Sequence, residues 1–381
     1  MSWIAVGGEK NKVGHVPISE NLSDVQRSGV FAPPGHWRLG WYWAGRRREA
    51  SILIDRRAFL ANVGLGVALI LTSLIYLCTG TVAIAPASTL RALFSEAEPT
   101  VAFVVNDLRL PRMLAAWLTG AAFAVAGCLM QTLARNRLAT PGIIGIDNGA
   151  TAFAVASVVG LGVSLAPPAM ALTGAATATA LTFGLAGGGG TRGYRFIVAG
   201  IGVGAVFGAA TQLLMARVAI DVANAAYPWT VGTLNARPTG TMTVLAIGLG
   251  IGVVLSLRLS RALSTMRFSE AIAQGLGISL RRSRLQALSL AVSLTALAVA
   301  VAGPVGMVGL IGPEIARHLS SPRGVPVIGS ALAGALVMTV SDGVGRLLLS
   351  PIELPVGIVT AIVGGPYLLW ILLRQGGSGN V

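Results

Sequence analysis

The chain has 381 residues, of which 54% are hydrophobic and only 11% are charged. Soluble domains usually carry about 25% charged residues, so this composition excludes an ordinary water-soluble protein and indicates a chain that lies mostly in lipid. The formal net charge of +14 could suggest a nucleic-acid partner, but the basic residues fall in short clusters between apolar runs instead of along one basic face. Basic loops on the cytoplasmic side of a membrane explain the charge more simply, and we expect no nucleic-acid partner.

Residues 1–57 are polar and precede the first apolar run. The extreme N-terminus has no apolar core, so the sequence predicts no cleavable signal peptide. An aromatic and basic cluster favours a segment that lies on the cytoplasmic leaflet, because aromatic rings favour the headgroup zone and arginines favour anionic lipid. A mostly disordered tail is the alternative. The cluster consists of Trp37, Trp41, Tyr42, Trp43, Arg46, Arg47 and Arg48.

Ten apolar segments follow, and they predict an all-α polytopic membrane protein with about ten transmembrane helices. About 20 apolar residues are needed to cross the hydrocarbon core as a helix. The segments are approximately 58–79, 113–133, 149–165, 168–187, 195–216, 241–258, 285–303, 305–318, 327–348 and 356–373. Residues 58–375 would form the membrane domain and 376–381 a short C-terminal tail. The eighth segment is short and rich in glycine, which a membrane tolerates only where protein or an aqueous cavity surrounds the backbone.

The distribution of arginines predicts the orientation of these segments. If the N-terminus is cytoplasmic, the even-numbered connections lie inside and carry most of the arginines, as the positive-inside rule requires. The inside set is Arg135, Arg137, Arg192, Arg195, Arg261, Arg267, Arg281, Arg282, Arg284, Arg317, Arg323 and Arg374. The smaller outside set is Arg91, Arg109, Arg112, Arg237 and Arg346. Both termini are therefore expected in the cytoplasm.

No set of residues typical of an enzyme is present. The three histidines, His15, His36 and His318, are scattered, and the metal, thiol and serine-hydrolase motifs are missing. Lysine occurs only at Lys10 and Lys12, so the chain cannot build a phosphate-binding P-loop. We expect no cofactor, no metal site and no catalytic residue, and if ATP drives this protein, a separate polypeptide binds it.

Two carboxylates lie within the predicted spans. Glu314 stands three residues before Arg317, and Asp342 stands four before Arg346; both spacings suit an ion pair on one helix face. We expect structural pairs at helix ends, although an intramembrane carboxylate is a functional candidate by default. A secondary transporter or channel that works without ATP would need more ionisable residues at the bilayer midplane than this sequence offers.

The polar connection from Arg267 to Arg284 predicts a short amphipathic helix. Ser269 can cap its start, and Gly275 and Gly277 would end it. Its apolar side would carry Ala271, Ile272 and Leu276. A helix that is too short to cross the membrane and lies between two membrane-spanning segments suits the docking of a cytoplasmic partner. The alternative is that this connection is an ordinary solvated loop.

Three sequence stretches resemble the FecCD family of permeases, which are membrane subunits of binding-protein-dependent ABC importers for iron-siderophores, haem and cobalamin. RLPRMLAAWLTGAAFAVAGCLMQTLARNRLATPGIIGIDNGA resembles that family's R-x-P-R, its G-A-x-x-x-x-x-G-x-x-x-Q helix and its R-N-P-L-A-x-P-x-x-x-G stretch. VGLIGPEIARHL is similar to V-G-L-x-x-P-H-x-x-R, and SDGVGRLLLSPIELPVGIVTAIVGGPYLLWIL to D-x-x-x-R … E-x-P-V-G. Matching positions include Pro111, Gly120, Ala121, Gly127, Gln131, Asn136, Leu138, Ala139, Pro141, Gly145, Pro313 and Arg317.

The resemblance implies a multi-pass subunit of the bacterial plasma membrane that pairs with a second permease subunit as a homodimer or heterodimer, with the translocation path at their interface. Cytoplasmic ATP-binding subunits would dock on the coupling segment, where EAIAQGLG resembles E-x-x-A-x-x-L-G. An extracytoplasmic substrate-binding protein would dock on outward arginines. The coupling positions are Glu270, Ala273, Leu276 and Gly277, and the docking positions are Arg109, Arg112 and Arg346.

The sequence departs from the family pattern at two positions. Arg137 stands where the family usually has proline, and Glu314 stands where it usually has histidine. A ferric siderophore is the expected ligand because it is the most frequent in the family, and cobalamin or haem are the alternatives.

Overall fold

The computed structural model describes residues 35–41, 50–94, 98–160, 165–187, 194–235, 239–320 and 324–375. The chain divides into two compact units, Met1–Arg56 and Arg57–Val381.

The first unit contains a β-hairpin that the sequence analysis did not predict. Strand β1 (His36–Trp41) pairs antiparallel with β2 (Ala50–Asp55), with Trp37 opposite Ile54. Aromatic and β-branched residues favour strands, and this preference was overlooked in a segment expected to be interfacial or disordered. Arg56 packs on the Trp37 ring at 5.5 Å. Tyr42, Trp43 and the three arginines 46–48 lie outside the described residues.

The second unit is helical, and each of the ten predicted spans overlaps a helix within it. Seven helices in the described residues are long and apolar enough to cross a membrane. Helix α6, with 14 residues, and α14, with 12, are shorter, and α16 qualifies only as a shorter apolar helix over Val356–Tyr367. The total of ten spans therefore stays a prediction. The overlapping helices are α2 (Arg56–Cys78), α5 (Leu110–Ala134), α6 (Ile146–Val159), α7 (Pro167–Leu185), α8 (Tyr194–Arg217), α11 (Thr239–Phe268), α13 (Leu280–Ala302), α14 (Val308–Leu319), α15 (Val327–Leu347) and α16 (Val356–Gln375).

Short helices occupy several connections between the predicted spans, and of these only the one after Ser269 was predicted. They are α3 (Pro86–Leu93), α4 (Pro99–Phe103), a π-helical turn η1 (Val104–Arg109), a 3₁₀ turn η2 (Pro141–Ile144), α9 (Ile220–Ala226), α10 (Pro228–Val231) and α12 (Glu270–Gly275). Proline begins several of these helices, which suits its fixed φ and its missing N–H. The turn η1 leads directly into α5, so the two form one continuous helical rod.

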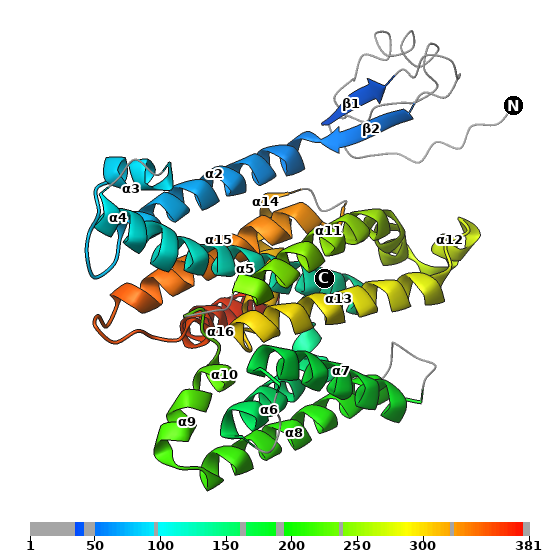
Figure 1. Cartoon of the computed structure of the whole chain (residues 1–381). Coiled ribbons are helices and arrows are strands. Elements are labelled where there is room, and N and C mark those ends of the chain that lie inside the picture. Colours follow the sequence, from blue (N-terminus) through cyan, green and yellow to red (C-terminus); the bar gives the residue numbers. More distant parts are fainter. Residues whose placement is uncertain are drawn as a thin grey trace, which may run out of the picture. The chain divides into compact units, whose positions relative to one another are not determined.

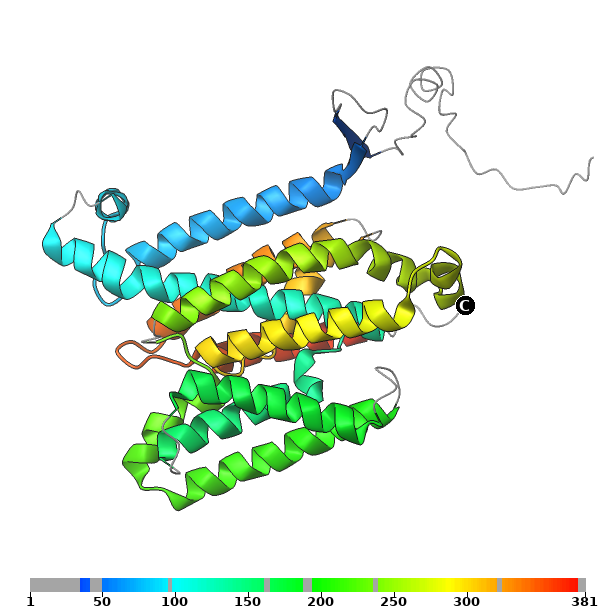
Figure 2. The same ribbon diagram turned by 45° about the vertical axis from the view of Figure 1, so that its right-hand side comes forward.

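Helix α5 is the centre of the second unit, with α11, α13, α14 and α15 packed around it (Figures 1 and 2). In the most apolar 18-residue window of the continuous helix Pro99–Ala134, which includes α5, 83% is buried. The corresponding value for α2 is 17%. Glycines allow α14 and α15 to pack closely on α5. A Cβ on Gly127 would overlap the carbonyl oxygen of Gly309, and a Cβ on Gly120 would overlap that of Gly334. Helices in lipid associate through such contacts. Helices α6, α7 and α8 form a second group beside this core, in contact through α13 (Figure 1).

Candidate functional site

Two clusters of charged side chains lie at the opposite ends of α5. The arginine cluster, at the start of α5, consists of Arg109, Arg112 and Arg346 with Tyr76, Asp342 and Glu353. The Glu314 cluster, near the end of α5, consists of Gln131, Arg137, Glu314, Arg317 and His318. The structure therefore brings together the three arginines that were predicted for docking, and it separates them from the arginines of the opposite set.

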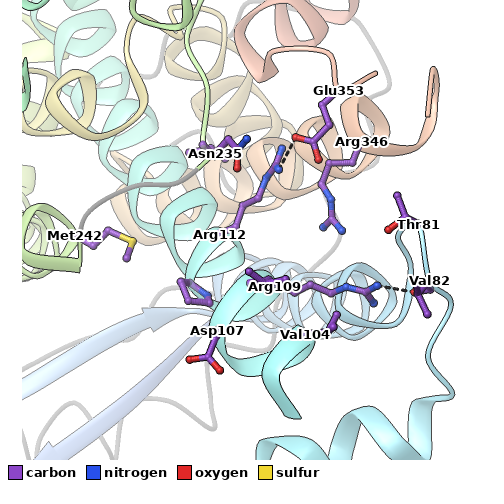
Figure 3. A pocket seen from close by; sticks show the side chains of 13 residues that line it. Thr81, Val82, Val104, Asp107, Arg109, Arg112, Asn235, Met242, Arg346 and Glu353 are labelled. Atoms are coloured by element: carbon purple, nitrogen blue, oxygen red, sulfur yellow. Dashed lines mark hydrogen bonds and ion pairs between the residues drawn. The ribbon is translucent and has the colours of Figure 1, made fainter. Parts of the chain in front are cut away.

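Arg112 is the centre of the arginine cluster (Figure 3). Its Nε and Nη2 donate to the two carboxylate oxygens of Asp342 at 2.8 and 2.9 Å, and its Nη1 donates to Glu353 Oε2 at 2.7 Å. Asp342 is 1% exposed and also accepts a hydrogen bond of 2.6 Å from the Tyr76 hydroxyl. A bidentate guanidinium–carboxylate pair is geometrically specific, so Arg112 is held in one orientation.

The predicted pairing of Asp342 with Arg346 is wrong. Asp342 is committed to Arg112 and Tyr76, whereas the Arg346 guanidinium lies over the Tyr76 ring, 4.7 Å from its centroid. Its Nη2 is 3.5 Å from the Thr79 carbonyl oxygen. A ring face attracts a cation without neutralising it. Among the described residues Arg346 therefore has no carboxylate partner.

Arg109 is buried and supports the chain segment after α2. Its two terminal nitrogens donate to the carbonyl oxygens of Leu77 and Val82, each at 2.6 Å. Gly80, with φ +159°, leaves room for this side chain, because a Cβ there would lie 2.7 Å from Arg109 Nη2. With 4% of its surface exposed, Arg109 is placed for a structural role, which the geometry favours over the docking role expected from sequence.

A cavity of about 410 Å³ opens beside the arginine cluster. All three arginines line it together with two carboxylates, Asp107 and Glu353. Asp107 is an exposed residue within η1 and points away from Arg112, whereas Glu353 points toward it (Figure 3). Arg112 is already neutralised by Asp342, whereas Arg346 lines the cavity without a carboxylate partner among the described residues, so the part of the wall around Arg346 suits an anionic group.

The Glu314 cluster is built around one buried carboxylate, 3% exposed. Glu314 contacts Arg317 Nη2 at 2.9 Å, which confirms the predicted pair, and it also contacts Arg137 Nη1 at 3.2 Å and His318 Nδ1 at 3.5 Å. Arg317 Nη2 also donates to the Gln131 side-chain oxygen. The cluster thus joins α5, the segment that follows it and α14. The two residues that depart from the family pattern, Arg137 and Glu314, pair with each other.

The remaining motif residues shape the backbone after α5. Asn136 Oδ1 accepts from the Leu138 amide at 2.9 Å, which closes a local turn. Pro141 begins η2, and Gly145 ends it with φ +80°. Pro313 lies inside the short helix α14 and is buried. In this structure their role is to position the chain.

Helix α12 is the short helix predicted in the connection between α11 and α13. Ser269 caps it by accepting from the Ala271 amide at 3.2 Å, and Glu270 pairs with Arg284 of α13 at 2.7 Å. Phe268 at the end of α11, Ile272 within α12 and Leu276 directly after α12 are exposed by 77%, 55% and 69%. Together these three residues are called the exposed α12 face.

One predicted coupling residue does not belong to this face. Ala273 is fully buried, because α12 packs this side against its own unit. Its assignment as a surface for a partner is therefore corrected: Ala273 positions α12. Gly277 follows α12 with φ +80°, a backbone conformation that favours glycine. No atom lies within 4 Å of the position that a Cβ would take there.

Three residues of these regions were missed. Glu353 stands in a quoted motif but was given no role, and the burial of Tyr76 beside Asp342 has no local sequence signal. Asp147, in the first turn of α6, was not counted among the carboxylates of the spans, and its Oδ1 is buried without a hydrogen-bond partner in the described residues.

Comparisons with known proteins identify the family of the chain. A profile of the FecCD transport family matches residues 68–374. The chain is 34% identical over 321 residues to the achromobactin transport system permease protein CbrC of Dickeya dadantii (strain 3937), covering 83% of this chain and 92% of that protein. It is also 34% identical over 278 residues to the hemin transport system permease protein HmuU of Yersinia pestis, covering 71% and 83%.

A solved structure of a metal-chelate type ABC transporter in an inward-facing conformation matches with a TM-score of 0.71 and 26% sequence identity, covering 84% of this chain and 99% of that one. The relatives are permease components that align over most of the chain, and the described helices are able to cross a membrane several times. The protein is therefore a multi-pass membrane permease component, and the chain belongs to the FecCD transport family.

Proposed function

We propose that this chain is the transmembrane subunit of an ABC importer for a ferric siderophore, and that it pairs with a second permease subunit to form the translocation path. A binding protein delivers the chelate at the arginine cluster, and separate ATPase subunits bind the exposed α12 face. The observation that carries the proposal is the separation of these two surfaces at opposite ends of the helical unit.

The two surfaces suit different partners. Positive charge around a cavity attracts carboxylates and sets the register and on-rate of docking. The exposed α12 face is apolar and small, which suits a groove in a second protein. ATP binding in the partner would shift the permease between outward-open and inward-open populations. The basic residues near α12 support a cytoplasmic position for that end, because arginines are enriched on the cytoplasmic side of membrane proteins.

Paired carboxylates disfavour an ATP-independent transporter. Such a transporter needs titratable groups near the midplane, whereas Glu314 and Asp342 are both bound to arginines near the ends of α5. Asp147, whose Oδ1 has no partner among the described residues, lies in the first turn of α6 and therefore also at a helix end. Haem is the second candidate ligand, because one of the relatives is named for hemin transport.

Reconstitution with the ATPase and binding-protein subunits of its importer tests the proposal. Iron-loaded achromobactin, haem and cobalamin are offered to proteoliposomes with and without ATP. We expect ATP-dependent uptake of the ferric siderophore only when all components are present. Uptake by the permease alone, driven by an ion gradient, would contradict the role of a separate ATPase. Uptake of haem but not of the ferric siderophore would show that haem is the ligand.

A further inference from the structure

We propose that Glu353 is an internal counter-ion that occupies the site on Arg112 where a carboxylate of the extracytoplasmic partner binds, so that docking requires Glu353 to leave. This inference rests on the proposed docking function and adds a residue that sets its affinity.

The contacts of Arg112 divide into a fixed part and a removable part. Asp342 holds Nε and Nη2, is 1% exposed and is itself fixed by the Tyr76 hydroxyl. Glu353 holds only Nη1, its side chain is 44% exposed, and it lies in the connection between α15 and α16. Exposed ion pairs contribute little stability. Glu353 can therefore be exchanged for another carboxylate, whereas Asp342 cannot.

The surroundings of this pair favour the exchange. Glu353 and Arg112 both line the 410 Å³ cavity, so an incoming carboxylate reaches Nη1 directly. Arg346 lines the same cavity and has no carboxylate partner among the described residues, so a second acidic group can bind there. The displaced Glu353 carboxylate moves into solvent, where its hydration replaces the lost contact.

A matched pair of neutral variants tests the proposal. Glu353→Gln and Asp107→Asn each remove one negative charge from the same cavity wall, but only Glu353 bonds Arg112. Arg346→Gln tests the docking function without disturbing Asp342. The full chain is placed in lipid nanodiscs, and binding of fluorescein-labelled hexaglutamate is measured by anisotropy, with hexaglutamine as the neutral probe.

We expect Glu353→Gln to tighten hexaglutamate binding about tenfold, because one charge-assisted hydrogen bond becomes available, and Asp107→Asn to tighten it by about twofold through long-range charge alone. Arg346→Gln should weaken binding. If Arg346→Gln weakens binding but Glu353→Gln changes it no more than Asp107→Asn, the counter-ion role is wrong and the docking function stands. If none of the variants changes binding, both are wrong.

Discussion

The two ends of α5 use the same residue types for opposite purposes. In the Glu314 cluster, two arginines and His318 converge on one buried carboxylate and join segments of the chain. In the arginine cluster, only Arg112 has carboxylate partners among the described residues, whereas Arg109 is held by carbonyl oxygens and Arg346 by an aromatic ring. Neutral partners position a cation without cancelling its charge. The first arrangement joins segments of the chain, whereas the second leaves Arg109 and Arg346 without carboxylate partners among the described residues, which is the basis of the proposed docking function.

The largest expected effect comes from removing the fixed carboxylate of the arginine cluster. Asp342→Asn leaves the partly buried Arg112 guanidinium with only the exposed Glu353 as a carboxylate partner, and breaking a buried pair costs about 3–5 kcal/mol. The free energy of unfolding in detergent, followed by tryptophan fluorescence, should fall by that amount. Glu353→Gln is the control, because it removes an exposed partner of the same arginine and should cost about 1 kcal/mol or less. Equal losses for the two variants would contradict the division into fixed and removable contacts.

The next largest expected effect comes from placing a charge on the buried side of α12, compared with the same change on its exposed side. Ala273→Asp buries an unpaired charge against the helical unit and should destabilise the chain by about 3 kcal/mol. Ile272→Asp changes an exposed position and should alter stability by no more than about 0.5 kcal/mol, yet it should reduce co-purification of the ATPase subunits. Normal ATPase binding by the Ile272 variant would show that the exposed α12 face is not the docking surface.

The smallest effect concerns the two departures from the family pattern. Arg137 is 57% exposed in its contact with Glu314, so their coupling should be about 0.5 kcal/mol. A double-mutant cycle with Arg137→Pro, Glu314→His and the double variant measures it through the unfolding free energy. The double variant should be more stable than the sum of the single changes implies. Strict additivity would mean that the two departures are independent.

Local sequence signals predicted local structure well. Long apolar runs identified the helices, a serine cap and two glycines defined α12, and three-residue spacing gave the pair of Glu314 with Arg317. Each of these features depends on residues that are close in the chain. The hairpin of the first unit was missed because its strands are short and lie in a segment dominated by polar residues.

The arginine cluster was only partly predictable, because its contacts join residues far apart in sequence. Asp342 and Arg112 are separated by 230 positions, so the four-residue spacing to Arg346 suggested the wrong partner. The burial of Arg109 depends on the path of the chain after α2, and that of Ala273 on how α12 packs. Neither property has a sequence pattern of its own.

The central claim is that the arginine cluster faces outward and α12 faces the cytoplasm. Single cysteines placed at Asp107 and at Gln274 in a background of Cys78→Ser and Cys128→Ser test it, because both positions are exposed and lie at opposite ends of the helical unit. An impermeant maleimide added to intact spheroplasts should label the Asp107→Cys variant at once and the Gln274→Cys variant only after permeabilisation. The reverse labelling pattern would contradict the account.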